Sequence, residues 1–279
     1  MGDDGNPTRS SSRSPRRPLP RVGGSVINGW VGAGRPTGRD GPACFQLAMA
    51  ALSSRRLAEV QRRVAEVHRQ SDLRQLLRFY NGWAEDYDQD VAMLQYQAPS
   101  LAAAFLASIF QGSAEDALVL DVACGTGLVA QELQAKGFRH LHGLDGSREM
   151  LEHARHKGLY EDLKLCLLGQ ETLPVPEGCY DATVIVGALS EGQVPSGVIP
   201  QLLLVTKPGG YVCLTTRNNS SNLPYKIELQ QLLNDLEQQG LWEKVGMQEV
   251  EKWERATSHQ ESDQDSDYIS GVVYIYRKK

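Results

Sequence analysis

The sequence has few cysteines: five in 279 residues, and no two of them form a C-x-x-C pair. Their odd number and scattered positions exclude a disulfide framework and a zinc site built from paired cysteines. Isolated cysteines of this kind are typical of small core residues in a reducing compartment. We therefore expect a cytoplasmic protein, with the nucleus as the alternative.

Long apolar runs and an excess of positive charge are also absent. No apolar stretch approaches the roughly 20 residues that a membrane-spanning helix needs. The net charge of -5 argues against a dedicated nucleic-acid-binding protein. His140 and His142 alternate on one side of a predicted strand, but no third ligand stands at a plausible position, so we expect no metal. We expect a monomer whose partner is neither a membrane nor a nucleic acid.

The most informative stretch is ALVLDVACGTGLVAQEL, residues 117–133. Its apolar start predicts a buried strand, and Gly125 and Gly127 permit a tight turn with positive φ. The apolar spacing that resumes at Leu128 predicts the start of a helix. A strand, a glycine turn and a helix N-terminus in this order predict a nucleotide-binding crevice.

The charged residues around this turn indicate which kind of nucleotide would bind. Asp121 ends the predicted strand, where a carboxylate repels a pyrophosphate and attracts a ligand that carries an amino group. No Lys or Arg lies between Asp121 and Gln134. Asp145 ends the next predicted strand, eighteen positions after Gly127, where an acid typically accepts hydrogen bonds from ribose hydroxyls. The alternative role for Asp145 is a helix cap, which Ser147 can also provide.

These motifs resemble those of class I S-adenosylmethionine-dependent methyltransferases. The resemblance covers roughly residues 71–279 and follows the family's order. It rests on FYNGWAEDYD (79–88), DVACGTG (121–127), Asp145, LGQETLP (168–174), YDATVIVGALSEG (180–192) and LLLVTKPGGYVCLTT (202–216). It implies transfer of a methyl group from S-adenosylmethionine, which becomes S-adenosylhomocysteine, to an unidentified small-molecule or protein acceptor.

The fold that this resemblance implies is α/β and Rossmann-like, the class I methyltransferase fold. It has a seven-stranded, mostly parallel sheet with an antiparallel last strand and helices on both faces. Apolar segments that alternate with helical spacings along the chain agree with this architecture. The expected strands lie near residues 117–122, 139–144, 163–168, 180–186, 211–216, 247–254 and 270–277.

Composition divides the chain into three parts. Residues 1–44 are rich in Arg, Ser, Pro and Gly, which predicts a disordered tail. A nuclear-localisation patch, a phosphorylated arginine–serine segment and a transit peptide are the alternatives. Residues 45–98 are predicted to form helices that cover the cofactor site, since apolar residues recur at helical spacing from Leu57 to Val67. Residues 99–279 are the predicted methyltransferase core.

The resemblance also implies site residues. The expected cofactor-binding residues are Trp83, Tyr87, Asp121, Ala123, Cys124, Gly125, Thr126, Gly127, Asp145, Gly146, Met150, Gln170, Glu171, Val186 and Leu189. The substrate-pocket candidates are Ser190, Glu191, Arg217 and Asn218. Glu191 is the candidate base, with surface exposure as its alternative, and the catalytic residues are otherwise unknown.

Two acceptor classes are disfavoured because their signatures are missing. The segment after the fourth predicted strand lacks the N/D-P-P-Y tetrapeptide of enzymes that methylate amino groups of adenine or glutamine. A Pro-Cys pair of the kind that attacks pyrimidine C6 is missing as well. Two other functions stay open. Gly125, Gly127 and Ala130 also fit the G-x-G-x-x-A pattern of a nicotinamide-dependent oxidoreductase, and a scaffold would bind the cofactor without turnover.

Overall fold

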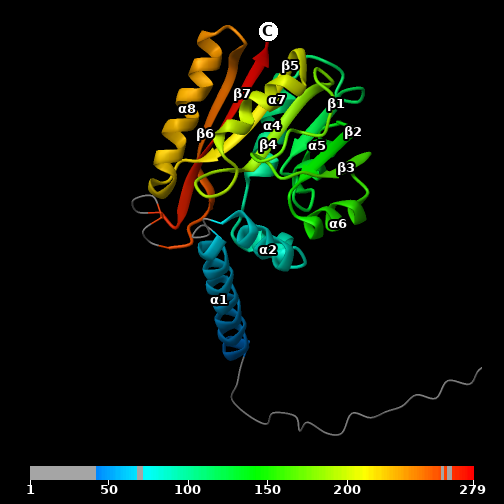
Figure 1. Cartoon of the computed structure of the whole chain (residues 1–279). Helices are drawn as coiled ribbons and strands as arrows, with labels where there is room; N and C mark the ends of the chain where they lie inside the picture. The colour runs from blue at the N-terminus through cyan, green and yellow to red at the C-terminus, as the bar shows by residue number, and fades with distance from the viewer. Residues whose placement is uncertain (1–41, 68–71, 259–260, 263–265) are drawn as a thin grey trace, which may run out of the picture. The chain divides into compact units, whose positions relative to one another are not determined.

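The computed structural model describes residues 42–67, 72–258, 261–262 and 266–279 (Figure 1). Residues 1–46 and 47–279 form separate units. Apart from the first residues of one helix, 42–46, everything described below lies in the second unit. The predicted disordered tail, with the localisation and processing signals considered for it, lies outside the described residues except for 42–44, which are helical. Within the described residues, no helix is long and apolar enough to cross a membrane.

The described residues form one seven-stranded sheet. Its strands are β1 (Leu118–Val122), β2 (His140–Asp145), β3 (Asp162–Leu165), β4 (Tyr180–Leu189), β5 (Thr206–Arg217), β6 (Trp242–Arg255) and β7 (Tyr268–Lys278). Their order is β3-β2-β1-β4-β5-β7-β6 (Figure 1). The first five strands are parallel, and β7 runs antiparallel to both β5 and β6. The predicted mostly parallel sheet with an antiparallel last strand is confirmed.

The strand predictions were wrong at several ends. Strand β6 begins at Trp242 and not near residue 247, and β5 begins at Thr206 and not near residue 211. The sequence does not indicate where β6 begins, because the residues after Trp242 show no apolar alternation. Most of them are exposed or only half-buried in the strand. Trp242 pairs with Lys278 of β7, and its fully buried indole stacks on Tyr276 with 4.2 Å between ring centroids.

Helices cover both faces of the sheet (Figure 1). The described helices are α1 (Pro42–Val67), α2 (Leu73–Trp83), α3 (Tyr87–Met93), α4 (Ala98–Ile109), α5 (Leu128–Ala135), α6 (Arg148–Lys157), α7 (Ile199–Val205) and α8 (Leu223–Gln238). Those on the two faces include α4 and α5 on one side and α7 and α8 on the other. Because strand side chains alternate, Val119 packs with α4 and α5, whereas Leu120 packs with α7 and α8. Both residues are fully buried, so β1 lies at the centre of the core.

The helices α1, α2 and α3 form a separate apolar cluster above the carboxyl ends of the strands. Val60, Val64 and Val67 are buried there, which confirms the predicted apolar face of α1. Its arginine-rich outer face is only partly solvated, because Arg63 pairs with the buried Asp90 at 2.6 Å. The side chain of Gln61 donates to the carbonyl of Ala256 at 2.8 Å and ties α1 to the region after β6.

Candidate active site

The glycine turn joins β1 to α5 and shapes the floor of the site. Gly125 and Gly127 have φ of 53° and 93°, and Gly127 donates its N–H to the carbonyl of Cys124 at 2.9 Å. A Cβ on Gly127 would lie 3.1 Å from the ring of Tyr160, so both conformation and space favour glycine there. Cys124 is buried, and burial raises the pKa of its thiol well above the usual range. A protonated, packed thiol is a poor nucleophile.

Asp145 stands at the end of β2 and is held by the backbone. Its Oδ2 accepts the N–H of Gly125 at 2.8 Å, and its Oδ1 accepts the N–H of Ser147 at 2.7 Å. The hydroxyl of Ser147 caps α6 by accepting the N–H of Met150 at 3.2 Å. Burial raises the pKa of Asp145, while these backbone hydrogen bonds lower it. Each carboxylate oxygen keeps a second lone pair for a ligand.

A cavity of about 750 Å³ opens beside Asp145, and we call it the Asp145 cavity. Among the described residues that line it, Asp145 is the single charged side chain. A pyrophosphate would meet no cation there and would be repelled by the carboxylate. The cavity therefore suits a ligand that is neutral or cationic and that offers donors to Asp145.

Seven of the fifteen expected cofactor-binding residues line this cavity: Tyr87, Ala123, Gly125, Asp145, Gly146, Met150 and Val186. The sequence prediction missed other lining residues. They are Leu73, Leu76, Leu77, Tyr80, Leu167, Leu168, Gly187, Ala188, Gln193 and Val194. One signal was available for Tyr80, which precedes Trp83 by three positions and so shares its helix face.

Several expected residues lie off the cavity wall. Gln170 and Glu171 are exposed, and the carboxylate of Glu171 accepts the N–H of Leu167 at 2.8 Å. Leu189 belongs to the core under α7 and α8. Cys124, Thr126 and Gly127 belong to the turn itself and are buried, and Trp83 lines a neighbouring cavity.

Asp121 lies in β1, shortly before the glycine turn, and is not among the residues that line the Asp145 cavity. It is 1% exposed, and its Oδ2 accepts the hydroxyl of Tyr160 at 2.7 Å. Its Oδ1 is buried and has no partner among the described residues. Burial raises the pKa of Asp121 to about 7, although the hydrogen bond from Tyr160 lowers it. An unpartnered buried acceptor is costly and fits a ligand or water that donates to it.

Aromatic side chains of α2 and α3 form the roof. Trp83 is 4.8 Å from Tyr87 between ring centroids, and its indole N–H donates to Asp90 at 2.8 Å. Asp88 holds α3 on the glycine turn by accepting the hydroxyl of Thr126 at 2.5 Å and the ammonium of Lys157 at 2.6 Å. The roof is therefore bound to the same turn that forms the floor.

A second cavity of about 560 Å³ adjoins the first, and we call it the Arg217 cavity. The two cavities share the wall residues Tyr80, Tyr87, Gly187 and Gln193. The hydroxyl of Tyr80 donates to Oε1 of Gln193 at 3.0 Å, while the buried Nε2 of Gln193 has no partner among the described residues. The wall that the two cavities share therefore contains an amide N–H₂ donor, that of Gln193, which is available to a ligand.

Two of the four substrate-pocket candidates line the Arg217 cavity, namely Ser190 and Arg217. Glu191 is exposed and lines a neighbouring open groove with Gln170. Asn218 accepts a hydrogen bond from Lys226 and does not line the cavity. The sequence placed all four together because they follow the ends of β4 and β5, but the chain turns Glu191 and Asn218 outward.

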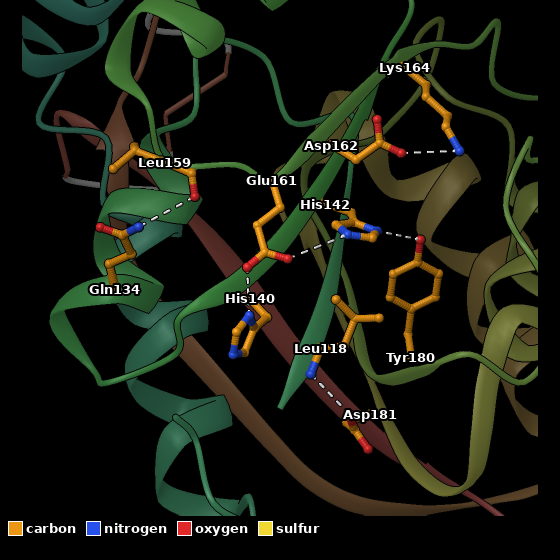
Figure 2. Close-up of polar contacts among 10 residues, drawn as sticks. All are labelled: Leu118, Gln134, His140, His142, Leu159, Glu161, Asp162, Lys164, Tyr180 and Asp181. Atoms are coloured by element: carbon orange, nitrogen blue, oxygen red, sulfur yellow. Dashed lines mark hydrogen bonds and ion pairs between the residues drawn. The ribbon is translucent and has the colours of Figure 1, made fainter. Parts of the chain in front are cut away.

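The two predicted strand histidines lie at the opposite, amino edge of the sheet. Figure 2 shows both turned toward Glu161, with His140 at 2.6 Å and His142 at 3.9 Å from its carboxylate. The other ring nitrogen of His142 meets the hydroxyl of Tyr180 at 3.0 Å. Within the described part of the chain, no three His, Cys, Asp or Glu residues are grouped to hold a metal.

Comparison with known proteins agrees with this geometry. A methyltransferase-domain family model matches residues 119–210. The fold is similar to a chain in the complex between the Haloferax volcanii Trm112 methyltransferase activator and the putative methyltransferase. The TM-score is 0.51 at 14% identity, over 71% of this chain and 97% of that chain. This likeness supports the fold alone.

The chain belongs to the class I S-adenosylmethionine-dependent methyltransferases. The particular relative that carries this assignment is human methyltransferase-like protein 27, to which the chain is 61% identical over 187 residues, 67% of this chain and 76% of that protein. The chain is also 34% identical to the ubiquinone biosynthesis O-methyltransferase of Vibrio parahaemolyticus, over 37% of this chain and 44% of that enzyme. It is an S-adenosylmethionine-dependent methyltransferase, as predicted, and not a nicotinamide-dependent oxidoreductase.

Proposed function

We propose that the enzyme holds S-adenosylmethionine in the Asp145 cavity and methylates a small molecule bound in the Arg217 cavity. The observation that carries this proposal is the wall that the two cavities share. Methyl transfer is an in-line displacement and depends on alignment of the acceptor with the methyl group. A compound in the Arg217 cavity lies next to the cofactor cavity, across Tyr87 and Gly187.

The residues of the Asp145 cavity fit the cofactor. Asp145 would accept the ribose hydroxyls, and the apolar side chains of Met150, Leu167 and Leu168 would contact the adenine. The unpartnered Oδ1 of Asp121 suits the amino group, directly or through a water. The aromatic ring of Tyr87 attracts a cationic ligand. When bound, the cofactor supplies a methyl group that its sulfonium already activates.

A small molecule fits the Arg217 cavity better than a protein segment. The cavity lies between the ends of β4, β5 and β6 and the helices α1 to α3, so protein surrounds it on several sides. The similarity to a ubiquinone biosynthesis O-methyltransferase supports a small-molecule acceptor and an oxygen acceptor atom.

The four cysteines at described positions are free, which supports a reducing compartment such as the cytoplasm.

Labelled S-adenosylmethionine, incubated with the enzyme and a cell extract, tests the proposal. After protein is removed, we expect the label in a small-molecule product that separates from unreacted S-adenosylmethionine by chromatography. Calorimetry should show S-adenosylhomocysteine binding to the enzyme at one site per chain. Label that stays with protein would contradict the small-molecule acceptor, and absence of binding at millimolar S-adenosylhomocysteine would contradict the cofactor site.

Replacing Asp121 with asparagine is expected to weaken S-adenosylhomocysteine binding more than tenfold, because the buried site loses its negative charge. It should also change the pH dependence of stability. An unfolded aspartate ionises near pH 4, whereas folded Asp121 has a pKa of about 7. Between these values the folded chain binds more protons, so the free energy of unfolding falls as pH rises. Asp121→Asn removes this contribution to the slope.

Calorimetry and thermal unfolding at pH 5 and pH 8 measure both effects. The exposed Asp116 supplies the control, because Asp116→Asn changes the charge equally at a surface position. An Asp121→Asn variant with the affinity and the pH slope of this control would remove Asp121 from the site.

A further inference from the structure

Strand β6 brings an acidic side chain to the Arg217 cavity that the sequence did not indicate. The register between β6 and β7 shifts between Val250 and Glu254, which pair with Gly271 and Ile269. A bulge of this kind redirects the side chains of the bulged strand and is common next to active sites. After the shift, Trp253 and Glu254 both line the Arg217 cavity.

Contacts on both sides fix this part of β6. The indole of Trp253 lies so close to Gly271 that a Cβ there would be 2.2 Å from the ring. The carbonyl of Trp253 accepts the N–H of Gln97 at 3.0 Å, and the N–H of Arg255 donates to the carbonyl of Leu94 at 2.8 Å. The backbone of Glu254 is therefore held between two anchored neighbours, which fixes the point on the strand where its side chain meets the Arg217 cavity.

We propose that Glu254 is the base of the methyl transfer and that the acceptor is a phenol-class hydroxyl on a compact flat ring. This inference rests on the proposed function, because it places the acceptor in the Arg217 cavity. The candidate base predicted from the sequence, Glu191, is exposed on the neighbouring groove.

The hydroxyl oxygen of the acceptor attacks the methyl carbon and forms a C–O bond. The C–S bond breaks, its electron pair stays on sulfur, and the positive charge of the sulfonium is lost. The hydroxyl proton passes to the carboxylate of Glu254. The products are an aryl methyl ether, a neutral thioether and a protonated Glu254, which returns its proton to water.

The lining of the Arg217 cavity favours a flat ring. Five of its fourteen described lining residues are aromatic, and aromatic side chains bind ring faces through stacked and edge contacts. They are Tyr80, Trp83, Tyr87, Tyr96 and Trp253. Arg217 is 9% exposed and lines the same cavity, so it disfavours a protonated amine and stabilises oxygen that becomes negative. A carboxylic acid as acceptor is already ionised at pH 7 and would need no base.

The ionisation of Glu254 supports this role. Burial raises the pKa of Glu254 to about 7, although the positive charge of Arg217 opposes the shift and Glu261 adds to it. The other titratable groups near Glu254 are the hydroxyls of Tyr80, Tyr87 and Tyr96, whose pKa values are raised mainly by burial. A base with a pKa near the working pH is the most effective proton acceptor.

Catechol (1,2-dihydroxybenzene) is the probe for the test. We expect the wild-type enzyme to transfer labelled methyl from S-adenosylmethionine to catechol, with kcat rising through about pH 7. Glu254→Gln should lower kcat at pH 8 about a hundredfold or more, change KM for catechol less than threefold, and remove the rise with pH. Glu251→Gln, at an exposed position of the same strand, is the matched control and should behave as wild type.

A second measurement does not depend on turnover. In protein labelled with ¹³C at glutamate carboxyls, one resonance should titrate near pH 7 in wild type and in Glu251→Gln, and be missing in Glu254→Gln. Thermal unfolding and calorimetry with S-adenosylhomocysteine show whether Glu254→Gln is folded. If it is not, Glu254→Asp replaces it and should keep both the pH-dependent rise and part of kcat.

The outcomes separate the two proposals. Failure of wild type to bind S-adenosylhomocysteine overturns the proposed cofactor site itself. Binding of S-adenosylhomocysteine without methylation of catechol overturns the phenol-class acceptor. Methylation of catechol by Glu254→Gln within threefold of wild type, or no glutamate resonance that titrates near pH 7, overturns the role of Glu254 and leaves the cofactor site standing.

Discussion

Replacing Asp145 with alanine is expected to weaken binding of S-adenosylhomocysteine at least a hundredfold. Asp145 is the charged side chain of the Asp145 cavity and would accept two ribose hydroxyls. Hydrogen bonds to a charged group contribute about 1.5–3 kcal/mol each. Loss of two therefore costs about 3 kcal/mol or more, and each 1.4 kcal/mol corresponds to about tenfold in affinity.

The substitution acts on the floor of the site as well. The N–H groups of Gly125 and Ser147 both donate to Asp145, so alanine leaves two donors without acceptors beside the ligand. Asparagine would keep one oxygen acceptor, and we expect Asp145→Asn to fall between alanine and wild type. This ranking distinguishes loss of hydrogen bonds from a general loss of negative charge, which both variants share.

Isothermal titration calorimetry measures the effect directly. Asp162→Ala is the matched control, because Asp162 lies at the amino end of β3, does not line the Asp145 cavity and pairs with Lys164 (Figure 2). The control should bind with wild-type affinity. An Asp145→Ala variant that binds within fivefold of wild type would show that Asp145 does not contact the ligand.

The parts of the site that could be predicted from sequence are contiguous in the chain. Strand β1, the turn at Gly125 and the start of α5 follow one another within residues 117–133, so local spacing was enough. Asp145 was found because the second strand of this fold ends at a fixed distance from the turn. Both features depend on the spacing of residues that are close together in the chain, and a single sequence shows this spacing.

The parts that could not be predicted depend on contacts between distant segments. Glu254 reaches the Arg217 cavity because of a register shift against β7 and because Trp253 packs on Gly271. No pattern within β6 itself reports this shift. Glu191 shows the converse case, a predicted site residue that does not line the Arg217 cavity. It follows β4 closely in the chain, but its backbone N–H donates to the side chain of Asn222 at 2.9 Å and its own side chain is exposed.

Gly271→Ala is expected to be among the most damaging single substitutions in the core. An added Cβ would lie 2.2 Å from the nearest ring atom of Trp253, whose side chain is 1% exposed. The indole cannot yield by a small rotation because three of its ring atoms would lie between 2.2 and 2.7 Å from the added Cβ, so it must leave its position. The cost approaches that of losing a buried aromatic side chain, about 3–5 kcal/mol. Since each kcal/mol lowers Tm by about 2–4 °C in a domain of this size, we expect Tm to fall by about 10 °C.

Displacement of Trp253 should also disturb the bulge that carries Glu254, so the loss of activity toward catechol should exceed the loss of affinity for S-adenosylhomocysteine. Differential scanning fluorimetry and calorimetry measure the two effects. Gly82→Ala is the control, because a Cβ at this exposed position of α2 meets nothing within 4 Å. Alanine favours a helix by up to about 1 kcal/mol over glycine, so this variant should melt no lower than wild type. A Gly271→Ala variant that melts within 2 °C of wild type would mean that the indole moves at little cost, and Glu254 would then lack the rigid support on which its proposed role depends.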